Sequence, residues 1–192
     1  MKGKTAFVVI IIAVAASVIA VPKIYGRIMR IMYPVRYEDI IEKYAKENEL
    51  DPYLVLGLIK AESNFVSDAC SHRGAHGLMQ ITESTAAWCA TKMKLENFSG
   101  GESLVEPETN IKIGCWYLKY LLDEYDGSAE LALCAYNAGI GNVGKWLDDK
   151  NYSPDGVTLE KIPFPETEKY VVNTQSYMKR YSELYPKLFG NG

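Results

Sequence analysis

Helical periodicity recurs along almost the whole chain after Arg36, and it restricts the fold more than any other feature. Apolar side chains return at spacings of three and four residues, whereas the alternation typical of strands is scarce. The connecting segments are rich in glycine, proline, asparagine and aspartate. Together with the capping residues, this pattern predicts a mainly α fold with helices at about Tyr37–Asn48, Pro52–Ser63, Thr82–Lys94, Pro107–Tyr125, Ser128–Ala138, Asn142–Asp148 and Pro165–Tyr185.

Charged residues are divided unevenly along the chain. Every acidic residue lies after Arg36, and residues 37–192 carry 24 acidic against 15 basic side chains, a net charge of −9. Such an acidic segment argues against a nucleic-acid partner. Its 156 residues are enough to bury about 70% of their unfolded surface in one core. We therefore predict a single domain over residues 37–192, preceded by a separate segment, residues 1–36.

The N-terminal segment begins with an apolar stretch. Lys2 and Lys4 precede an uncharged run of 17 residues, Thr5–Val21, which as a helix would be about 25 Å long against a hydrocarbon core of roughly 30 Å. The run is short but adequate for a membrane span. A cleavable signal peptide is the alternative, because Val18-Ile19-Ala20 loosely resembles a processing site. We favour an uncleaved transmembrane anchor.

A basic segment follows this run. Its cations are interleaved with apolar residues, so the segment could lie along an anionic outer leaflet. Read literally, the positive-inside rule would place the domain in the cytoplasm. However, the numbers of positive charges before and after the apolar run differ by only one. The chemistry predicted below outweighs that bias and favours a single-pass membrane protein with an extracytoplasmic domain. The basic residues are Lys23, Arg27, Arg30 and Arg36, and the apolar ones are Ile24, Ile28, Ile31 and Met32.

Cysteine and histidine offer little for metal or nucleophilic chemistry. The four cysteines lack a zinc-type spacing, so we expect no metal site and no cofactor. The two histidines, His72 and His76, lie in a glycine-interrupted stretch and are expected to be solvated loop residues. Free thiols and at least one disulfide both remain open. The cysteines are Cys70, Cys89, Cys115 and Cys134.

Glu62 is an acid on an otherwise apolar helix face. The helix begins with Asp51 as N-cap and Pro52 at its first position, and its apolar stripe of Val55, Leu58 and Ile59 continues at Glu62. Burial disfavours the ionised carboxylate, and so does the negative end of the helix dipole. Both effects raise the pKa of Glu62 and favour a proton donor near neutral pH. The alternative is a partly exposed glutamate that happens to fall on the stripe.

Four motifs follow one another along the chain, and their order decides between these interpretations. They are Glu62-Ser63-Asn64-Phe65 with Ala69 and Ser71, Gly77-Leu78-Met79-Gln80, Ala135-Tyr136-Asn137-Ala138-Gly139, and Ile162-Pro163 with Glu166-Thr167 and Tyr170-Val171. The set resembles the transglycosylase SLT domain, the catalytic domain of soluble lytic transglycosylases. The resemblance covers roughly residues 37–185 and implies a lysozyme-like fold.

The resemblance also implies roles for individual residues. Glu62 matches the family's single catalytic acid and base, and Ser71 matches a polar residue near the reacting sugar. Tyr170 matches the tyrosine whose hydroxyl faces the catalytic carboxylate. Glu166 matches as well, without a clear role. The remaining matches, expected to contact the glycan, are Met79, Gln80, Tyr136 and Asn137.

The implied reaction is lytic cleavage of peptidoglycan. Glu62 would protonate the β-1,4 oxygen between N-acetylmuramic acid and N-acetylglucosamine, and would then accept a proton from the muramyl 6-hydroxyl, leaving a 1,6-anhydromuramyl end. The nearest spare acids, Asp68 and Glu83, read as solvated charges. A hydrolase like goose-type lysozyme and an inactive, membrane-tethered glycan-binding module are the alternatives. We expect the chain to act as a monomer.

The chain departs from the family at one position. Homologues usually carry proline where this chain has Glu83, directly after Thr82. Because proline favours the first turn of a helix, its loss predicts a weaker helix start at this point.

Overall fold

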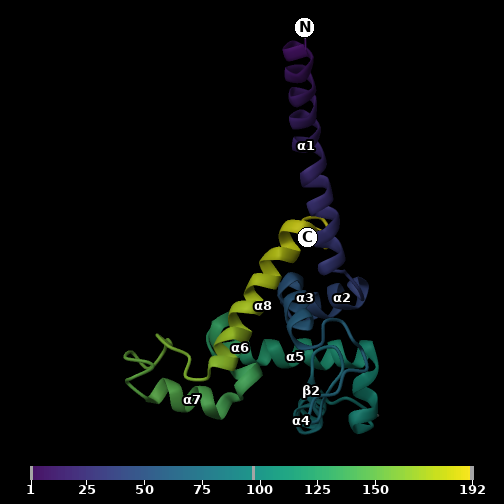
Figure 1. The fold of residues 1–192 in the computed structure, drawn as a ribbon. Coiled ribbons are helices and arrows are strands. Elements are labelled where there is room, and N and C mark those ends of the chain that lie inside the picture. Colours follow the sequence, from purple (N-terminus) through teal and green to yellow (C-terminus); the bar gives the residue numbers. More distant parts are fainter. Residues whose placement is uncertain (1, 97, 191–192) are drawn as a thin grey trace. The chain divides into compact units, whose positions relative to one another are not determined.

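The structure is a computed structural model that describes residues 2–96 and 98–190, with side chains described from residue 17 onward. The chain divides into two compact units, Met1–Val35 and Arg36–Gly192 (Figure 1). The elements in chain order are α1 (Lys2–Met32), α2 (Glu38–Glu47), α3 (Pro52–Glu62), β1 (Ala75–His76), β2 (Ile81–Thr82), α4 (Glu83–Met93), the 3₁₀ helix η1 (Gly100–Val105), α5 (Pro107–Glu124), α6 (Ala129–Ala138), α7 (Ile140–Asp148) and α8 (Pro165–Leu184).

The first unit is dominated by one helix, α1, which contains Pro22. In the part of the chain whose side chains are described, no helix is both long and apolar enough to cross a bilayer. Most of the apolar run Thr5–Val21 lies outside those side chains. The transmembrane anchor therefore stays a prediction.

The second unit is mainly helical, as the periodicity predicted. All seven predicted helices are present, and most end within two residues of the predicted bounds. Two elements of secondary structure were not predicted from the sequence, because they are too short to show a periodic pattern. The segment predicted as a loop, residues 95–106, contains η1, and β1 and β2 form a small antiparallel hairpin with Ala75 opposite Thr82 and His76 opposite Ile81.

The core of the second unit centres on α3. Its middle residues, 54–59, are all buried, and α8 packs against it (Figure 1). The backbones approach closely at Gly57, where an added Cβ would lie 2.7 Å from the Thr174 carbonyl oxygen. Phe65 and Tyr181 contact edge to face at a ring separation of 6.2 Å and are almost completely buried. This packing fixes the C-terminal end of α3, and Glu62 with it.

Helix α4 begins without the proline usual in the family. Thr82 occupies the N-cap position instead, and its hydroxyl accepts a hydrogen bond from the Thr85 amide at 3.2 Å. Such a cap stabilises a helix start by about 1 kcal/mol. The expected weakness is therefore offset by Thr82.

All four cysteines are free thiols. Cys70 is exposed, whereas Cys89, Cys115 and Cys134 are buried. Burial raises the pKa of Cys89 and of Cys134 to about 12. These two thiols thus stay protonated and pack as small apolar groups.

Candidate active site

Glu62 is the last residue of α3, and the chain turns sharply after it. Asn64 and Phe65 both adopt positive φ angles, 52° and 65°. The Ser63 hydroxyl donates to the Leu78 carbonyl at 2.8 Å, which ties the helix end to the second motif. The turn leaves the Glu62 side chain half-buried at the helix end, where it lines two adjoining pockets.

The protonation of Glu62 is set by its surroundings. Burial raises the pKa of its carboxyl group to about 7, against a smaller opposing effect of the Tyr170 hydroxyl. The direction is the one expected from its place on the apolar stripe. At neutral pH the protonated and ionised forms are therefore both well populated, as a group that must give and take a proton requires.

Two tyrosines accompany this carboxyl group. The Tyr136 hydroxyl donates to the Met79 carbonyl at 2.8 Å, and burial raises its pKa well above the ordinary value. The Tyr170 hydroxyl is buried and makes no hydrogen bond of normal geometry with any described residue. It is still near enough to Glu62 to oppose the rise in that residue's pKa. Both tyrosines thus stay neutral near Glu62.

The second motif is held in place by Asn110 of α5. The Asn110 side chain accepts from the Met79 amide at 2.7 Å and donates to the carbonyls of His76 and Leu104 at 2.9 and 2.8 Å. A Cβ at Gly77 would lie 2.2 Å from Asn110 Nδ2. Gly77 is therefore required by this packing.

Met79 and Gln80 have different surroundings. The Met79 side chain is fully buried, and its sulfur packs over Gly114 of α5. Gln80 adopts a φ angle of 48°, and its Nε2 donates to the carbonyls of Ala69 and Gly77 at 3.1 and 2.8 Å. Gln80 lines a pocket with Glu62, whereas Met79 does not line either of the pockets that contain Glu62.

The two pockets at Glu62 bring most of the predicted residues together. One, of about 330 Å³, is lined by Glu62, Ser71, His72, Arg73, Ala75, Gln80, Thr82, Tyr136, Asn137 and Glu166. The other, of about 270 Å³, is lined by Ala61, Glu62, Asn137, Glu166, Lys169, Tyr170, Asn173 and Tyr177. Since Glu62, Asn137 and Glu166 line both, the pockets form one polar cleft across the end of α3.

Hydrogen bonds within the protein orient the walls of this cleft. The Ser71 hydroxyl accepts from the amides of Arg73 and Ala75 at 3.3 and 3.0 Å, which shapes the loop before β1. Asn137 Oδ1 accepts from the Thr167 hydroxyl at 2.8 Å, joining the end of α6 to the start of α8. One wall is therefore shaped by local hydrogen bonds of Ser71, and the other by a contact between helices distant in sequence.

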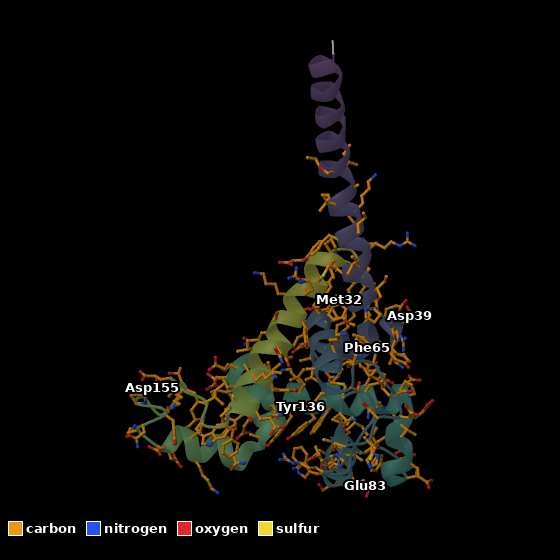
Figure 2. All side chains as sticks on the ribbon, viewed as in Figure 1. Met32, Asp39, Phe65, Glu83, Tyr136 and Asp155 are labelled. Atoms are coloured by element: carbon orange, nitrogen blue, oxygen red, sulfur yellow. The ribbon has the colours of Figure 1, made fainter. Side chains whose placement is uncertain are left out.

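Two residues of the cleft were not among the predicted site residues. His72 and Arg73 are exposed and line the larger pocket, although both belong to a segment interpreted as a solvated loop. Asp68 and Glu83 line neither pocket, and Figure 2 shows Glu83 well away from Tyr136, at the α4 end of the unit. Glu166 is the second acid of the cleft. Within residues 2–96 and 98–190 no cluster of three His, Cys, Asp or Glu side chains is placed to hold a metal ion.

This fold is that of a known family. Residues 39–156 match the Transglycosylase SLT domain, so the chain belongs to that family. The fold is shared with the 70-kDa soluble lytic transglycosylase of Escherichia coli, with a TM-score of 0.73 at 29% identity over 84% of this chain. The family resemblance and the mainly helical, lysozyme-like fold are thereby confirmed.

The chain spans less than half the length of the relatives it matches. The soluble lytic murein transglycosylase of Salmonella typhimurium is 35% identical over 150 residues, which are 78% of this chain and 23% of that protein. The membrane-bound lytic murein transglycosylase C of Yersinia pestis is 32% identical over 166 residues, 76% of this chain and 46% of that protein. A structure of the inactive Glu-to-Gln mutant of lytic transglycosylase Slt from Pseudomonas aeruginosa matches with a TM-score of 0.73 at 35% identity over 81% of this chain and 25% of that one.

Proposed function

We propose that the chain is a peptidoglycan lytic transglycosylase. The protonated Glu62 gives its proton to the β-1,4 oxygen, the bond from that oxygen to C1 of N-acetylmuramic acid breaks, and the acetamido oxygen stabilises the cation that develops at C1. The ionised Glu62 then takes the proton of the muramyl 6-hydroxyl, whose oxygen bonds to C1 as the acetamido group leaves. The carboxyl group regains its proton, and no water is consumed.

The observation that carries this proposal is the raised pKa of Glu62 together with its position in the cleft. A carboxyl group with a pKa of about 7 at the junction of two polar pockets can act first as acid and then as base. Family membership supports the choice of peptidoglycan, as does the naming of two relatives as murein transglycosylases. We assign substrate contacts to Ser71, Gln80, Tyr136, Asn137, Glu166 and Tyr170 through their side chains. Met79 contributes through its carbonyl, which holds Tyr136.

Product analysis tests the reaction type. Purified sacculi digested by the full-length chain should release muropeptides whose muramyl ends weigh one water less than those made by a hydrolase. Mass spectrometry of the digest distinguishes the two. Predominance of reducing, hydrated ends would contradict lytic cleavage and favour the lysozyme-like hydrolase, and no release at all would favour the glycan-binding module.

The effect of replacing Glu166 further distinguishes lytic cleavage from hydrolysis. Hydrolysing glycosidases use two acids, and Glu166 is the second acid of the cleft. If Glu62 acts alone, Glu166→Gln should lower the rate of sacculus digestion by less than about tenfold and leave the products anhydro. Turnover and product mass are both measured. A loss comparable to that of a Glu62 variant would contradict the single-acid mechanism.

The pH dependence follows from the protonation state of Glu62. The first step requires the carboxyl group to be protonated in the free enzyme, so kcat/KM should fall as pH rises through about 7. Digestion of soluble glycan strands from pH 5 to 9 at constant ionic strength measures this limb. A His72→Gln variant is the control, because His72 lines the same pocket as Glu62. A limb that disappears in the His72 variant would contradict the assignment to Glu62.

We also propose that residues 1–36 hold the enzyme at a membrane as a single-pass anchor, with the domain of residues 37–192 on the wall side. Two stripes on α1 support this proposal. Lys23, Arg27 and Arg30 recur at helical spacing and are exposed. Ile24, Ile28 and Ile31 form a parallel exposed stripe one residue on, about 100° around the helix. Adjacent apolar and basic stripes suit the surface of an anionic bilayer.

Neutralising the basic stripe tests the membrane contact. The triple variant Lys23→Gln, Arg27→Gln, Arg30→Gln should bind vesicles of phosphatidylglycerol and phosphatidylcholine about 100-fold more weakly, at roughly 1 kcal/mol for each cation. Binding to pure phosphatidylcholine should change little. Co-sedimentation of the full chain measures both. Equal losses on the two kinds of vesicle would argue against a charge-dependent contact.

A further inference from the structure

Two hydroxyl groups of α8 are buried without a hydrogen-bond partner among the described residues. They are Tyr170 Oη, in a side chain that is 9% exposed, and Thr174 Oγ1, in a residue that is completely buried. They are four positions apart, so they lie about one helical turn apart on the same face of α8. Because buried polar groups are nearly always paired, two neighbouring unpaired hydroxyls call for an explanation.

This face of α8 points toward the end of α3. The backbones are closest where the Thr174 carbonyl oxygen meets Gly57, as described above. Glu62 lies five residues beyond Gly57 on α3, and it lines the smaller pocket together with Tyr170. Thr174, Tyr170 and Glu62 therefore follow one another along the contact between the two helices, from its buried middle to the cleft.

The electrostatic effects among these groups have a consistent direction. The Tyr170 hydroxyl lowers the pKa of Glu62, as a donor to its carboxylate would. The Thr174 hydroxyl lowers the pKa of Tyr170, as a donor to the phenol oxygen would, against the larger raising effect of burial. The order of donation that fits both effects runs from Thr174 to Tyr170 to Glu62.

We propose that Thr174 is a positioning residue: its hydroxyl donates to Tyr170 Oη and so directs the Tyr170 O–H toward the ionised Glu62. This inference rests on the proposed function, in which ionised Glu62 is the base of the second step. Neither hydrogen bond has normal geometry in the structure. We expect both to form once Glu62 is ionised, because hydrogen bonds of catalytic groups are often long or poorly aligned in a substrate-free structure. A chain of two hydrogen bonds is stronger than its separate members, since each polarises the next.

Other groups that face Glu62 do not involve Thr174. Tyr136 faces it from α6, and His72 and Arg73 come from the loop that follows α3. Glu166 and Lys169 come from the first turn of α8. A change confined to the Thr174 hydroxyl leaves all of these in place, so we expect an effect on Glu62 to pass through Tyr170.

The test is a carboxyl ¹³C NMR titration of Glu62 in the full chain, with its resonance assigned by loss of the signal in Glu62→Gln. Tyr170→Phe should move the titration midpoint of Glu62 upward by about one pH unit, since a hydrogen bond to a charged group is lost. Thr174→Val should move it upward by about 0.2 to 0.3 of a unit, which is the share that polarisation by a neighbouring bond supplies. Thr174→Ser keeps the hydroxyl and should titrate like the unaltered protein.

The double variant Tyr170→Phe, Thr174→Val decides whether the effect passes through Tyr170. Its Glu62 midpoint should equal that of Tyr170→Phe alone. An unchanged midpoint in Thr174→Val, or a further shift on top of Tyr170→Phe, would overturn the proposal. The second outcome would indicate a bridging water or a general packing change. Because the titration needs no substrate, this failure is distinct from a failure of the transglycosylase assignment, which the product masses test.

Discussion

Replacing Glu62 by glutamine should lower the rate of sacculus digestion by about 10³-fold or more. One general acid or base contributes roughly 10²- to 10⁴-fold, and Glu62 is assigned both roles in succession. Glutamine keeps the size and the hydrogen-bonding capacity of the protonated acid, but it cannot transfer the proton. The loss should therefore appear in kcat, while the affinity for sacculi in a pull-down assay stays close to that of the unaltered protein.

A matched acid outside the cleft provides the control for this variant. Asp68 lies six residues further along the chain, is exposed, and lines neither pocket at Glu62. Asp68→Asn should digest sacculi at the normal rate. If Glu62→Gln retained more than about a tenth of the activity, the assignment of Glu62 as acid and base would be wrong.

Replacing Gly77 by alanine should give the largest loss of stability among single methyl additions to this chain. The residue has a φ angle of 78°, and its new Cβ would lie 2.2 Å from both Asn110 Nδ2 and the Leu104 carbonyl oxygen. The left-handed backbone costs an L-residue about 1 kcal/mol, overpacking adds about 1–3, and displacing Asn110 leaves buried groups unpaired at about 1–3 more. Urea unfolding of the full chain should show a free energy of unfolding lower by about 3–7 kcal/mol.

The variant Gly74→Ala separates the cost of the left-handed backbone from the cost of the steric contact with Asn110. Gly74 lies in the same loop with a φ angle of 70°, but an added Cβ would meet nothing within 4 Å. Gly74→Ala should therefore cost only the backbone term, about 1 kcal/mol. Equal effects of the two variants would show that the contact with Asn110 adds nothing to stability.

The helices of the second unit could be predicted because each contains its own signals. Asp51 and Pro52 start α3, and the spacing of Val55, Ile59 and Glu62 places the acid on the buried face. Each of these signals involves residues only a few positions apart, so it can be recognised in the sequence alone. The raised pKa of Glu62 follows from that placement alone, and so its direction was predictable.

The supports of the site could not be predicted in the same way. Asn110 lies three and four residues before Ile113 and Gly114 on the buried face of α5, and that spacing is a signal that could have identified it as a buried hydrogen-bonding group. Its partners, His76, Met79 and Leu104, lie in three other segments. His72 and Arg73 enter the cleft because of the hairpin that follows them, whose two-residue strands are too short to show a period. Such contacts depend on tertiary structure.

The elevated pKa of Glu62 also links acidity to folding. In the unfolded chain this carboxyl group ionises near pH 4.5, whereas in the folded chain it ionises near 7. The native state therefore binds the extra proton between these values, and its stability declines as pH rises through that interval. The full difference is on the order of 3 kcal/mol above pH 7. The contribution of this one group should therefore make the protein less resistant to heat in alkaline than in mildly acidic surroundings, which is the cost of keeping a reactive acid.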